Sequence, residues 1–274
     1  MIAKTKISTG PAPTDPELDV RRVSHQFQRL ESSEPFLALQ DIDLSVKRGK
    51  FLAIIGRSGC GKSTLLRIVA GLLNPTDGLV LQGGDLVHGP HYSRGFVFQA
   101  DAVFPWLTVR ENIEFGLRSR GFEKKKREEI STKWAGIVGL SEFINAYPKE
   151  LSGGMRKRVD LARVYANDPA VLLMDEPFGA LDAQTKERMQ TELLAMWEQS
   201  GKTVMFITHD VDEAIFLADE VVIMSSWPGE IAAKVSINLP RARTEETRVS
   251  DEFSAYRRSI RRTMQALDRE DVAK

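Results

Sequence analysis

The residues of this chain best suited to chemistry lie in a glycine-rich segment, residues 56–64. Glycines let successive backbone N–H groups point at an anion, and the lysine that follows them reaches the terminal phosphates of a nucleotide. The hydroxyl of Ser63 suits a magnesium ion that bridges those phosphates. The segment therefore predicts a nucleotide-binding loop with Mg²⁺, formed by Gly56, Ser58, Gly59, Cys60, Gly61, Lys62, Ser63 and Thr64.

Two adjacent carboxylates form a second candidate for chemistry. Asp175 and Glu176 follow an apolar run, residues 171–174, so we expect them at the end of a buried strand. Open α/β sheets bind ligands in the crevice beyond such strand ends. We assign Asp175 to the magnesium shell and Glu176 to the activation of an attacking water. An acid at a strand end is otherwise simply solvated, but the phosphate-binding loop favours the catalytic interpretation.

The elements around these residues follow the order that a phosphate site requires. Residues 51–55 form an apolar run of strand length, and residues 63–73 repeat apolar side chains at helical spacing until Asn74-Pro75. Residues 171–174 and 204–207 are apolar without alternation, which is typical of central parallel strands. This pattern predicts an α/β fold with a P-loop NTPase core.

The remaining segments predict an antiparallel β subdomain and a helical insert. Strands are expected at 20–27 and 39–46, and the insert covers about residues 100–150, with helices at 111–120 and 124–138. Beyond the insert, the pattern predicts helices at 153–166, 183–199 and 211–218, and a strand at 221–224.

The chain divides into three expected parts. These are a mobile leader at 1–18, a nucleotide-binding domain at 19–240 and a C-terminal tail at 241–274. The tail carries an apolar stripe at helical spacing, with arginines displaced from it. We predict an amphipathic helix that docks on the domain rather than on a membrane. The stripe consists of Phe253, Tyr256, Ile260, Met264 and Leu267.

Composition restricts the partners and the compartment. The 274 residues include 38 Lys+Arg and 38 Asp+Glu, so no overall positive field recruits nucleic acid. No apolar run approaches the length of a membrane span, and residues 1–20 lack the apolar core of a signal peptide. We therefore expect a cytoplasmic protein without a nucleic-acid partner. The single cysteine, Cys60, excludes an internal disulfide and a cysteine-cluster metal site.

Further motifs give the domain a family resemblance. They are Gln99, Leu151-Ser152-Gly153-Gly154-Met155, Gly179-Ala180-Leu181-Asp182 and Thr208-His209-Asp210. With the phosphate loop and the two carboxylates, they resemble, from about Asp19 to Ile231, the ATP-binding cassette of ABC transporters. Ser152 would cap a helix that begins near Gly153, and the glycines would leave N–H groups open for phosphate.

The resemblance implies an ATPase that uses ATP and Mg²⁺. It assigns Gln99 to the magnesium ion and the attacking water, Glu176 to the general base, and His209 to the γ-phosphate. Ser63 and Asp175 are its other magnesium ligands. Phe27 would stack on adenine, although an aromatic residue after a short strand is about as often part of a core.

The resemblance also implies that one chain does not complete its own site. Ser152, Gly153 and Gly154 of one subunit would close over the nucleotide held by a second copy of the chain. Asp182 would cross the seam between the two copies. The expected assembly is therefore a dimer with ATP between its subunits.

A closer resemblance is to ATPase subunits of importers for nitrate, sulfonate, taurine and bicarbonate. It rests on residues 97–108 with Phe104-Pro105-Trp106, and on segments 146–148, 176–182, 208–214 and 228–229. It implies an integral-membrane permease as partner, an extracytoplasmic solute-binding protein acting indirectly, and a peripheral location at the cytoplasmic face of the inner membrane. The chain departs from the usual pattern at Lys157, where glutamine is usual, at Asp160, where a small residue is usual, and at Arg57, where proline is common.

Two other classes of ATPase compete with the importer interpretation. An exporter or lipid-trafficking ATPase uses the same fold, and a neighbouring permease-like gene without a binding-protein gene would favour it. A DNA-repair or chromosome-organising ATPase requires a long coiled coil or zinc insert between phosphate loop and signature, and residues 63–150 are too short for one. Phe104 and Trp106 also have two interpretations. They either contact a helix of the permease or simply anchor the helical insert by hydrophobic packing.

Overall fold

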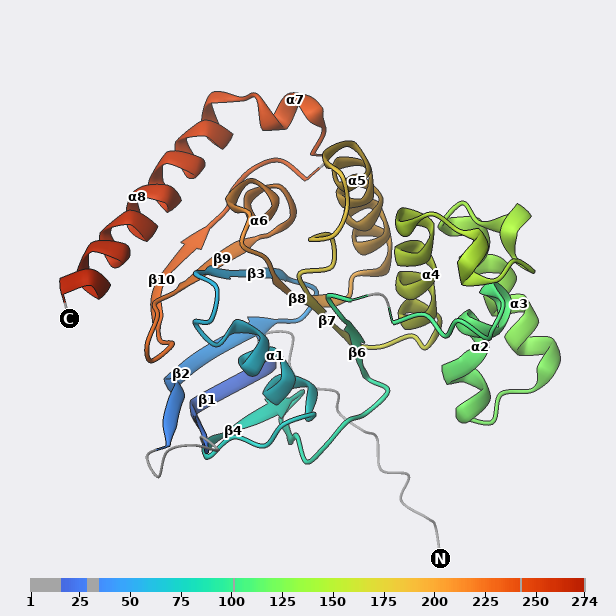
Figure 1. Ribbon diagram of the computed structural model, residues 1–274, viewed down its shortest axis with the longest axis horizontal. Coiled ribbons are helices and arrows are strands. Elements are labelled where there is room, and N and C mark those ends of the chain that lie inside the picture. The colour runs from blue at the N-terminus through green and yellow to red at the C-terminus, as the bar shows by residue number, and fades with distance from the viewer. Residues whose placement is uncertain (1–15, 29–34, 101, 242, 274) are drawn as a thin grey trace, which may run out of the picture.

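A parallel sheet at the centre of the protein carries the elements that surround the glycine-rich segment (Figure 1). The computed structural model describes residues 16–28, 35–100, 102–241 and 243–273. The strand order is β10-β9-β3-β8-β7-β6, and β10 pairs antiparallel with β9. The strands are β3 (Phe51–Gly56), β6 (Arg94–Val97), β7 (Val171–Asp175), β8 (Thr203–Ile207), β9 (Glu220–Met224) and β10 (Ile231–Ser236).

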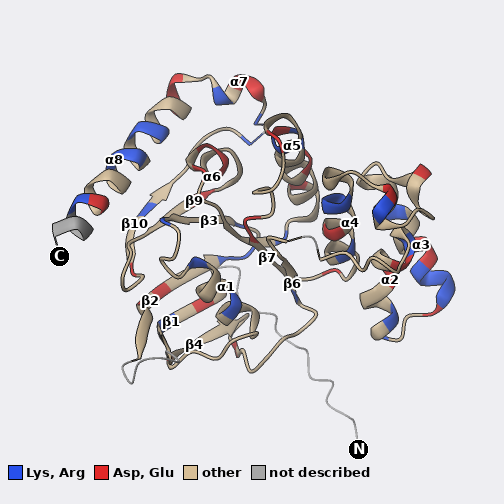
Figure 2. Cartoon of the chain, in the orientation of Figure 1, with Lys and Arg blue, Asp and Glu red and all other residues tan. Residues whose placement is uncertain are grey.

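The two uniformly apolar runs are central strands, as predicted. Every residue of β7 and β8 is buried, because helices cover both faces of the sheet (Figure 1). Charged side chains lie mainly on the helices around the sheet (Figure 2). The α/β class predicted from the sequence is therefore confirmed. In such sheets the ligand site lies at the edge where the parallel strands end.

An antiparallel sheet with the order β2-β1-β4-β5 lies beside the central sheet. Its strands are β1 (Pro16–Phe27), β2 (Phe36–Lys47), β4 (Asp77–Gln82) and β5 (Asp85–Leu86). The expected leader at 1–18 needs correction, because Pro16 and Leu18 already pair with Lys47 and Val46 of β2. Residues 16–18 belong to the sheet, whereas residues 1–15 lie outside the described part of the chain.

Helix α1 (Lys62–Ala70) follows the glycine-rich loop and ends earlier than its apolar pattern predicted. The prediction extended the helix to Leu73, with Asn74-Pro75 as the stop. Gly71 ends it instead, in the left-handed conformation with φ 76°. A Cβ at this position would lie 2.4 Å from the backbone of Gly89, so a close tertiary approach adds to the requirement for glycine.

A helical insert projects to one side of the sheet after β6 (Figure 1). It contains α2 (Val109–Ser119), α3 (Lys124–Ile137) and the start of α4 (Gly153–Ala166), with 3-10 turns at Ser141–Phe143 and Pro148–Glu150. Helix α2 begins at Val109 rather than at Glu111, because Thr108 and Glu111 form a reciprocal capping box. Helix α4 has the predicted bounds.

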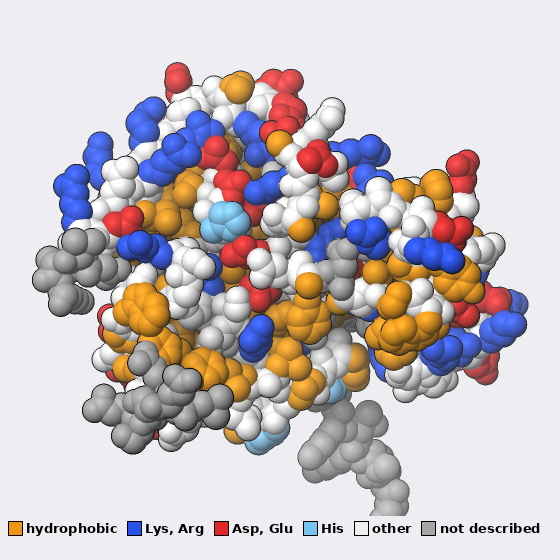
Figure 3. Space-filling view, in the orientation of Figure 1, with side chains coloured by type: hydrophobic (Ala, Val, Ile, Leu, Met, Phe, Trp, Pro, Cys, Tyr) orange, Lys and Arg blue, Asp and Glu red, His pale blue; other side chains and the backbone are white. Residues whose placement is uncertain are grey.

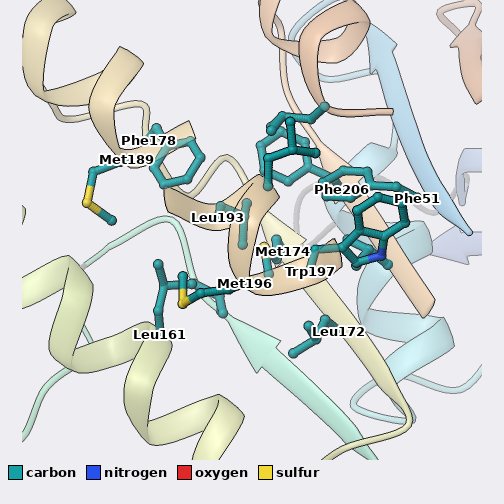
Figure 4. Close-up of a cluster of buried hydrophobic side chains, with 14 of the residues drawn as sticks. Phe51, Leu161, Leu172, Met174, Phe178, Met189, Leu193, Met196, Trp197 and Phe206 are labelled. Carbon is teal, nitrogen blue, oxygen red and sulfur yellow. The ribbon is translucent and has the colours of Figure 1, made fainter. Parts of the chain in front are cut away.

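Two further helices pack on the central sheet and complete the core. They are α5 (Ala183–Ser200) and α6 (Val211–Leu217). In the buried cluster of Figure 4, Trp197 of α5 packs edge-on against Phe51 of β3, with ring centroids 5.6 Å apart. Phe206 of β8 extends the same aromatic cluster, at 5.7 Å from Phe51. The core thus fixes the strand that leads into the phosphate loop.

The tail docks on the domain, as its apolar stripe predicted. After the short helix α7 (Glu245–Arg248), α8 (Asp251–Ala273) places Phe253 and Ile260 fully inside the core. Arg257 Nε lies 2.6 Å from Asp212 Oδ1 of α6, which adds an ion pair. Among the described residues, no helix combines the length and the apolarity needed to cross a membrane.

Candidate active site

The glycine-rich loop joins β3 to α1 and encloses the Lys62 ammonium. Lys62 Nζ donates hydrogen bonds to the carbonyl oxygens of Gly56 at 2.9 Å and Arg57 at 2.8 Å. Gly61 precedes α1 with φ 91°, and a Cβ there would lie 2.6 Å from Leu39 Cδ2. Glycine is therefore required at Gly61. The positive end of α1 faces the loop, an arrangement that attracts phosphate.

Ser63 and Asp175 meet beside the loop although they are distant in the sequence. Ser63 Oγ donates a hydrogen bond to Asp175 Oδ1 over 2.9 Å. Burial raises the pKa of Asp175 above its usual range, although the Ser63 hydrogen bond and the Arg67 charge oppose the rise. A hydroxyl and a carboxylate are oxygen ligands of the kind that Mg²⁺ prefers. The pair therefore fits the predicted magnesium site, and a cation there would favour the ionised carboxylate.

Glu176 and His209 form the second pair of the site. His209 Nδ1 lies 3.0 Å from Glu176 Oε2. The backbone of Glu176 has φ 42°, in the left-handed region that non-glycine residues rarely adopt. Its N–H donates to the carbonyl of Ile207 at 3.0 Å, which holds this conformation. Such strain persists where the surroundings impose it, and it is frequent at active sites.

One cavity of about 480 Å³ gathers most of the predicted site residues. A volume of this size suits a ligand as large as a nucleotide. The predicted residues that line it are Phe27, Ser58, Gly59, Gly61, Lys62, Ser63, Thr64, Gln99, Glu176 and His209. Gly56, Cys60 and Asp175 lie behind this lining, where all three are buried. Burial raises the pKa of the Cys60 thiol, so it is expected to be unreactive.

Phe36 and Ala38 also line the cavity, and the sequence reasoning missed both. Phe36 lies directly opposite Phe27 in the antiparallel pairing of β1 and β2, so both rings lie on one face. Trp227 packs edge-on against Phe36, with ring centroids 5.1 Å apart. The pairing of the two strands would have placed Phe36 opposite Phe27. The predicted second strand began at residue 39, however, and so excluded Phe36.

Ser152, Gly153 and Gly154, which we call the signature, lie outside the cavity, as does Asp182. Ser152 caps α4, as predicted, because its hydroxyl accepts a hydrogen bond from Met155 N at 3.3 Å. Asp182 caps α5 by accepting from Thr185 N at 3.0 Å. Gly154 approaches the same turn of α5, since a Cβ on it would lie 2.8 Å from Thr185 Cγ2. The structure therefore brings signature and Asp182 together, but apart from the phosphate loop.

Helices α5 and α6 hold the segment that carries His209. Asp210 caps α6 by accepting from the backbone N–H of Asp212 and Glu213. Lys186 Nζ of α5 donates to Asp210 at 2.8 Å. Burial opposes ionisation of Asp210, but the Lys186 hydrogen bond and charge hold its pKa below the usual range. The backbone beside His209 is fixed, while its ring is 63 % exposed and open to a ligand.

Known proteins resemble this chain over most of its length. A family model described as ABC transporter matches residues 39–179. The nitrate import ATP-binding protein NrtD of Synechocystis sp. is 46% identical over 242 residues, covering 86% of this chain and 91% of that protein. The taurine import ATP-binding protein TauB of Jannaschia sp. is 47% identical over 214 residues, covering 78% of this chain and 80% of that protein.

A solved structure shows the same fold. It is a dimeric structure of a post-hydrolysis state of the ATP-binding cassette MJ0796, bound to ADP and Pi. The match has a TM-score of 0.72 and 30% sequence identity, and it covers 81% of this chain and 100% of that chain.

Proposed function

Because this chain belongs to the ABC transporter family, we propose that it hydrolyses ATP to power the import of a small solute. The proposal is carried by the convergence of the phosphate loop, the Ser63–Asp175 pair and the Glu176–His209 pair around one cavity. The nitrate and taurine importers among its relatives support an anion such as nitrate, sulfonate, taurine or bicarbonate as the solute.

Hydrolysis requires the terminal phosphate to lie between Lys62 and the Glu176–His209 pair. Mg²⁺, when bound, neutralises phosphate charge, and Ser63, Gln99 and Asp175 are the residues that would hold it. Glu176 accepts a proton from the attacking water. Because His209 Nδ1 faces Glu176, its Nε2 is left to contact the γ-phosphate.

The aromatic end of the cavity suits the adenine base. Phe27 is 40% exposed and lines the cavity on the same sheet face as Phe36. Aromatic rings stack favourably on nucleobases, at about 1–3 kcal/mol per base. His25 packs edge-on against Phe27 with ring centroids 4.5 Å apart, which fixes the ring rather than burying it. We therefore assign Phe27 to adenine stacking.

A second copy of the chain would complete each site. Ser152, Gly153 and Gly154 begin a helix whose N–H groups suit phosphate, yet they do not line the phosphate-loop cavity. Closing them over the nucleotide of a partner subunit gives the signature its ligand and brings Asp182 to the seam. The dimeric state of the solved relative supports this arrangement.

A groove on the helical insert suits the permease. An apolar cavity of about 530 Å³ is lined by Phe98, Phe104, Phe115 and neighbouring residues. Phe104 is partly buried against Phe115, with ring centroids 4.4 Å apart, so it also anchors the insert. Trp106 is 69% exposed and packs against Phe104, with ring centroids 5.5 Å apart. Hydrophobic side chains gather on this side of the molecule in Figure 3. Docking here would hold the chain peripherally at the cytoplasmic face of the inner membrane.

The test of this function is transport in vesicles that contain the permease and its extracytoplasmic binding protein. We expect Trp106→Ala to keep the fold and ATP affinity of the subunit, but to reduce co-purification and transport about tenfold, because exposed aromatics dominate interface energies. Phe143→Ala is the control, since Phe143 is an exposed aromatic residue of the insert that, unlike Trp106, makes no ring contact with any described residue lining this groove. Normal transport by Trp106→Ala would reject the permease groove.

The same vesicles decide between import and export. Uptake that depends on ATP, on Glu176 and on the solute-binding protein supports the importer. Outward movement of solute or lipid without a binding protein would instead support an exporter or lipid-trafficking ATPase.

A further inference from the structure

Three charged side chains of α4 form a buried cluster that the proposed mechanism does not use. Lys157, Asp160 and Arg163 follow one another at intervals of three, so they share one face of the helix. Lys157 is 3% exposed and Asp160 is fully buried. Lys157 Nζ lies 3.8 Å from Asp160 Oδ2, and Arg163 forms an ion pair with Asp160 Oδ1. We call these three residues the charged triad.

The two cations of the triad also form hydrogen bonds with the chain segment that carries Gln99. Lys157 Nζ donates to the carbonyl oxygen of Phe98 at 2.8 Å, directly before Gln99. Arg163 Nη1 donates to the carbonyl oxygen of Ala102 at 2.6 Å, on the other side of Gln99. Residue 101 between them is not among the described residues. The two cations of α4 therefore bind one carbonyl oxygen on each side of Gln99; we call the described residues 98–100 and 102 the glutamine segment.

The hydration cost of burying these charges indicates that the cluster does not serve stability alone. Buried ions lose several kcal/mol of hydration each, and a buried ion pair is often no more stable than apolar residues of the same volume. Lys157 and Arg163 each donate a hydrogen bond to a backbone carbonyl oxygen in addition to their ion pairs with Asp160. Gln99 itself is exposed and faces the 480 Å³ cavity. Without such bonds, an exposed segment would sample many conformations.

We propose that Lys157, Asp160 and Arg163 are positioning residues that fix Gln99 for the magnesium ion and the attacking water. The signature Ser152 caps the same helix, about 8 Å along the axis from Lys157 at 1.5 Å per residue. Helix α4 thus connects the signature to the glutamine segment as one rigid body. This inference rests on the proposed role of Gln99 in hydrolysis.

The test uses Lys157→Met in the full chain, which removes the donor to Phe98 but leaves Asp160 paired with Arg163. We expect ATP affinity without Mg²⁺ to stay within about twofold, kcat to fall about tenfold, and the Mg²⁺ concentration for half-maximal hydrolysis to rise. Lys126→Met is the matched control, because Lys126 pairs with Glu129 at the same spacing on the surface of α3. A merely structural role would lower the melting temperature without changing the Mg²⁺ dependence.

Other outcomes are equally decisive. If Lys157→Met folds and hydrolyses ATP like Lys126→Met, the inference is wrong. If it does not fold, Arg163→Met, which removes the donor to Ala102 and leaves Asp160 with Lys157, is judged by the same criteria. Failure of both to fold would show that the triad holds the fold rather than Gln99, and would overturn the inference. Gln99→Ala is measured in parallel: normal Mg²⁺ dependence in that variant would reject the role of Gln99 itself.

Discussion

At the scale of single residues, the proposed mechanism assigns the binding of ATP and its hydrolysis to different side chains. Lys62 and the phosphate loop provide positive charge and N–H groups, which act on any bound phosphate. Glu176 contributes differently, because its carboxylate faces His209 and lines the opening of the cavity. Loss of a binding residue should therefore weaken ATP affinity, whereas loss of Glu176 should stop turnover without weakening ATP affinity.

Glu176→Gln tests this separation. The amide keeps the size of the side chain but does not accept the proton of water, so we expect kcat to fall by about 10²–10⁴. ATP affinity should stay near the parental value, and a nucleotide-bound dimer should accumulate in size-exclusion chromatography with ATP and Mg²⁺. Hydrolysis at the parental rate, or a variant that remains monomeric at high protein concentration, would contradict the assignment.

At the scale of elements, the C-terminal helix stabilises the half of the domain that carries His209. Helix α8 inserts Phe253 into the core and pairs Arg257 with Asp212, near the start of α6. Because α6 begins directly after the His209 segment, docking of α8 also limits movement there. The tail is thus part of the folded domain rather than an appended extension.

Phe253→Ala measures the contribution of this docking. Removing a fully buried phenylalanine costs about 3–5 kcal/mol, and at about 2–4 °C per kcal/mol the melting temperature should fall by roughly 6–20 °C. Val249→Ala, at an 82% exposed position just before α8, should leave the melting temperature within about 1 °C. An unchanged melting curve for Phe253→Ala, with rapid amide exchange across residues 251–268, would indicate a free tail.

At the scale of the whole molecule, each chain would carry two complementary halves of an ATP site, as the proposed dimer requires. The phosphate loop lines the 480 Å³ cavity, whereas the signature at the start of α4 does not. A symmetric dimer pairs each half with its complement, because the same two surfaces meet twice across a two-fold axis.

Mixing two inactive variants tests that arrangement. Lys62→Ala destroys the phosphate loop and keeps the signature, while Gly153→Trp blocks the signature and keeps the phosphate loop. The nearest atom to a Cβ at Gly153 is Arg156 Nη2, at 3.7 Å, so the substitution leaves the fold of its own subunit intact. Each variant alone should be inactive, whereas their mixed dimer contains one intact site and should recover hydrolysis, up to about half of the parental rate per mixed dimer. Activity of the mixture no greater than the sum of the separate variants would contradict a shared site.

The sequence by itself determined the parts of the site that are contiguous in the chain. The phosphate loop, the Ser152 cap and the Asp175-Glu176 pair depend on local backbone geometry and on hydrogen bonds between near neighbours. The uniform apolar runs likewise predicted β7 and β8, because a strand buried on both faces consists of apolar residues throughout.

Only the tertiary structure decided which distant residues meet. Phe36 reaches the cavity through the register of β1 and β2, and the backbone of Gly89 lies so close to Gly71 that a Cβ there has no room. The sequence likewise shows that Lys157 departs from the usual family pattern but not what it contacts, since the carbonyl oxygen of Phe98 lies in a distant segment after β6. Residue type and periodicity record how far a side chain is buried, whereas packing between elements decides what it contacts, and that depends on the whole chain at once.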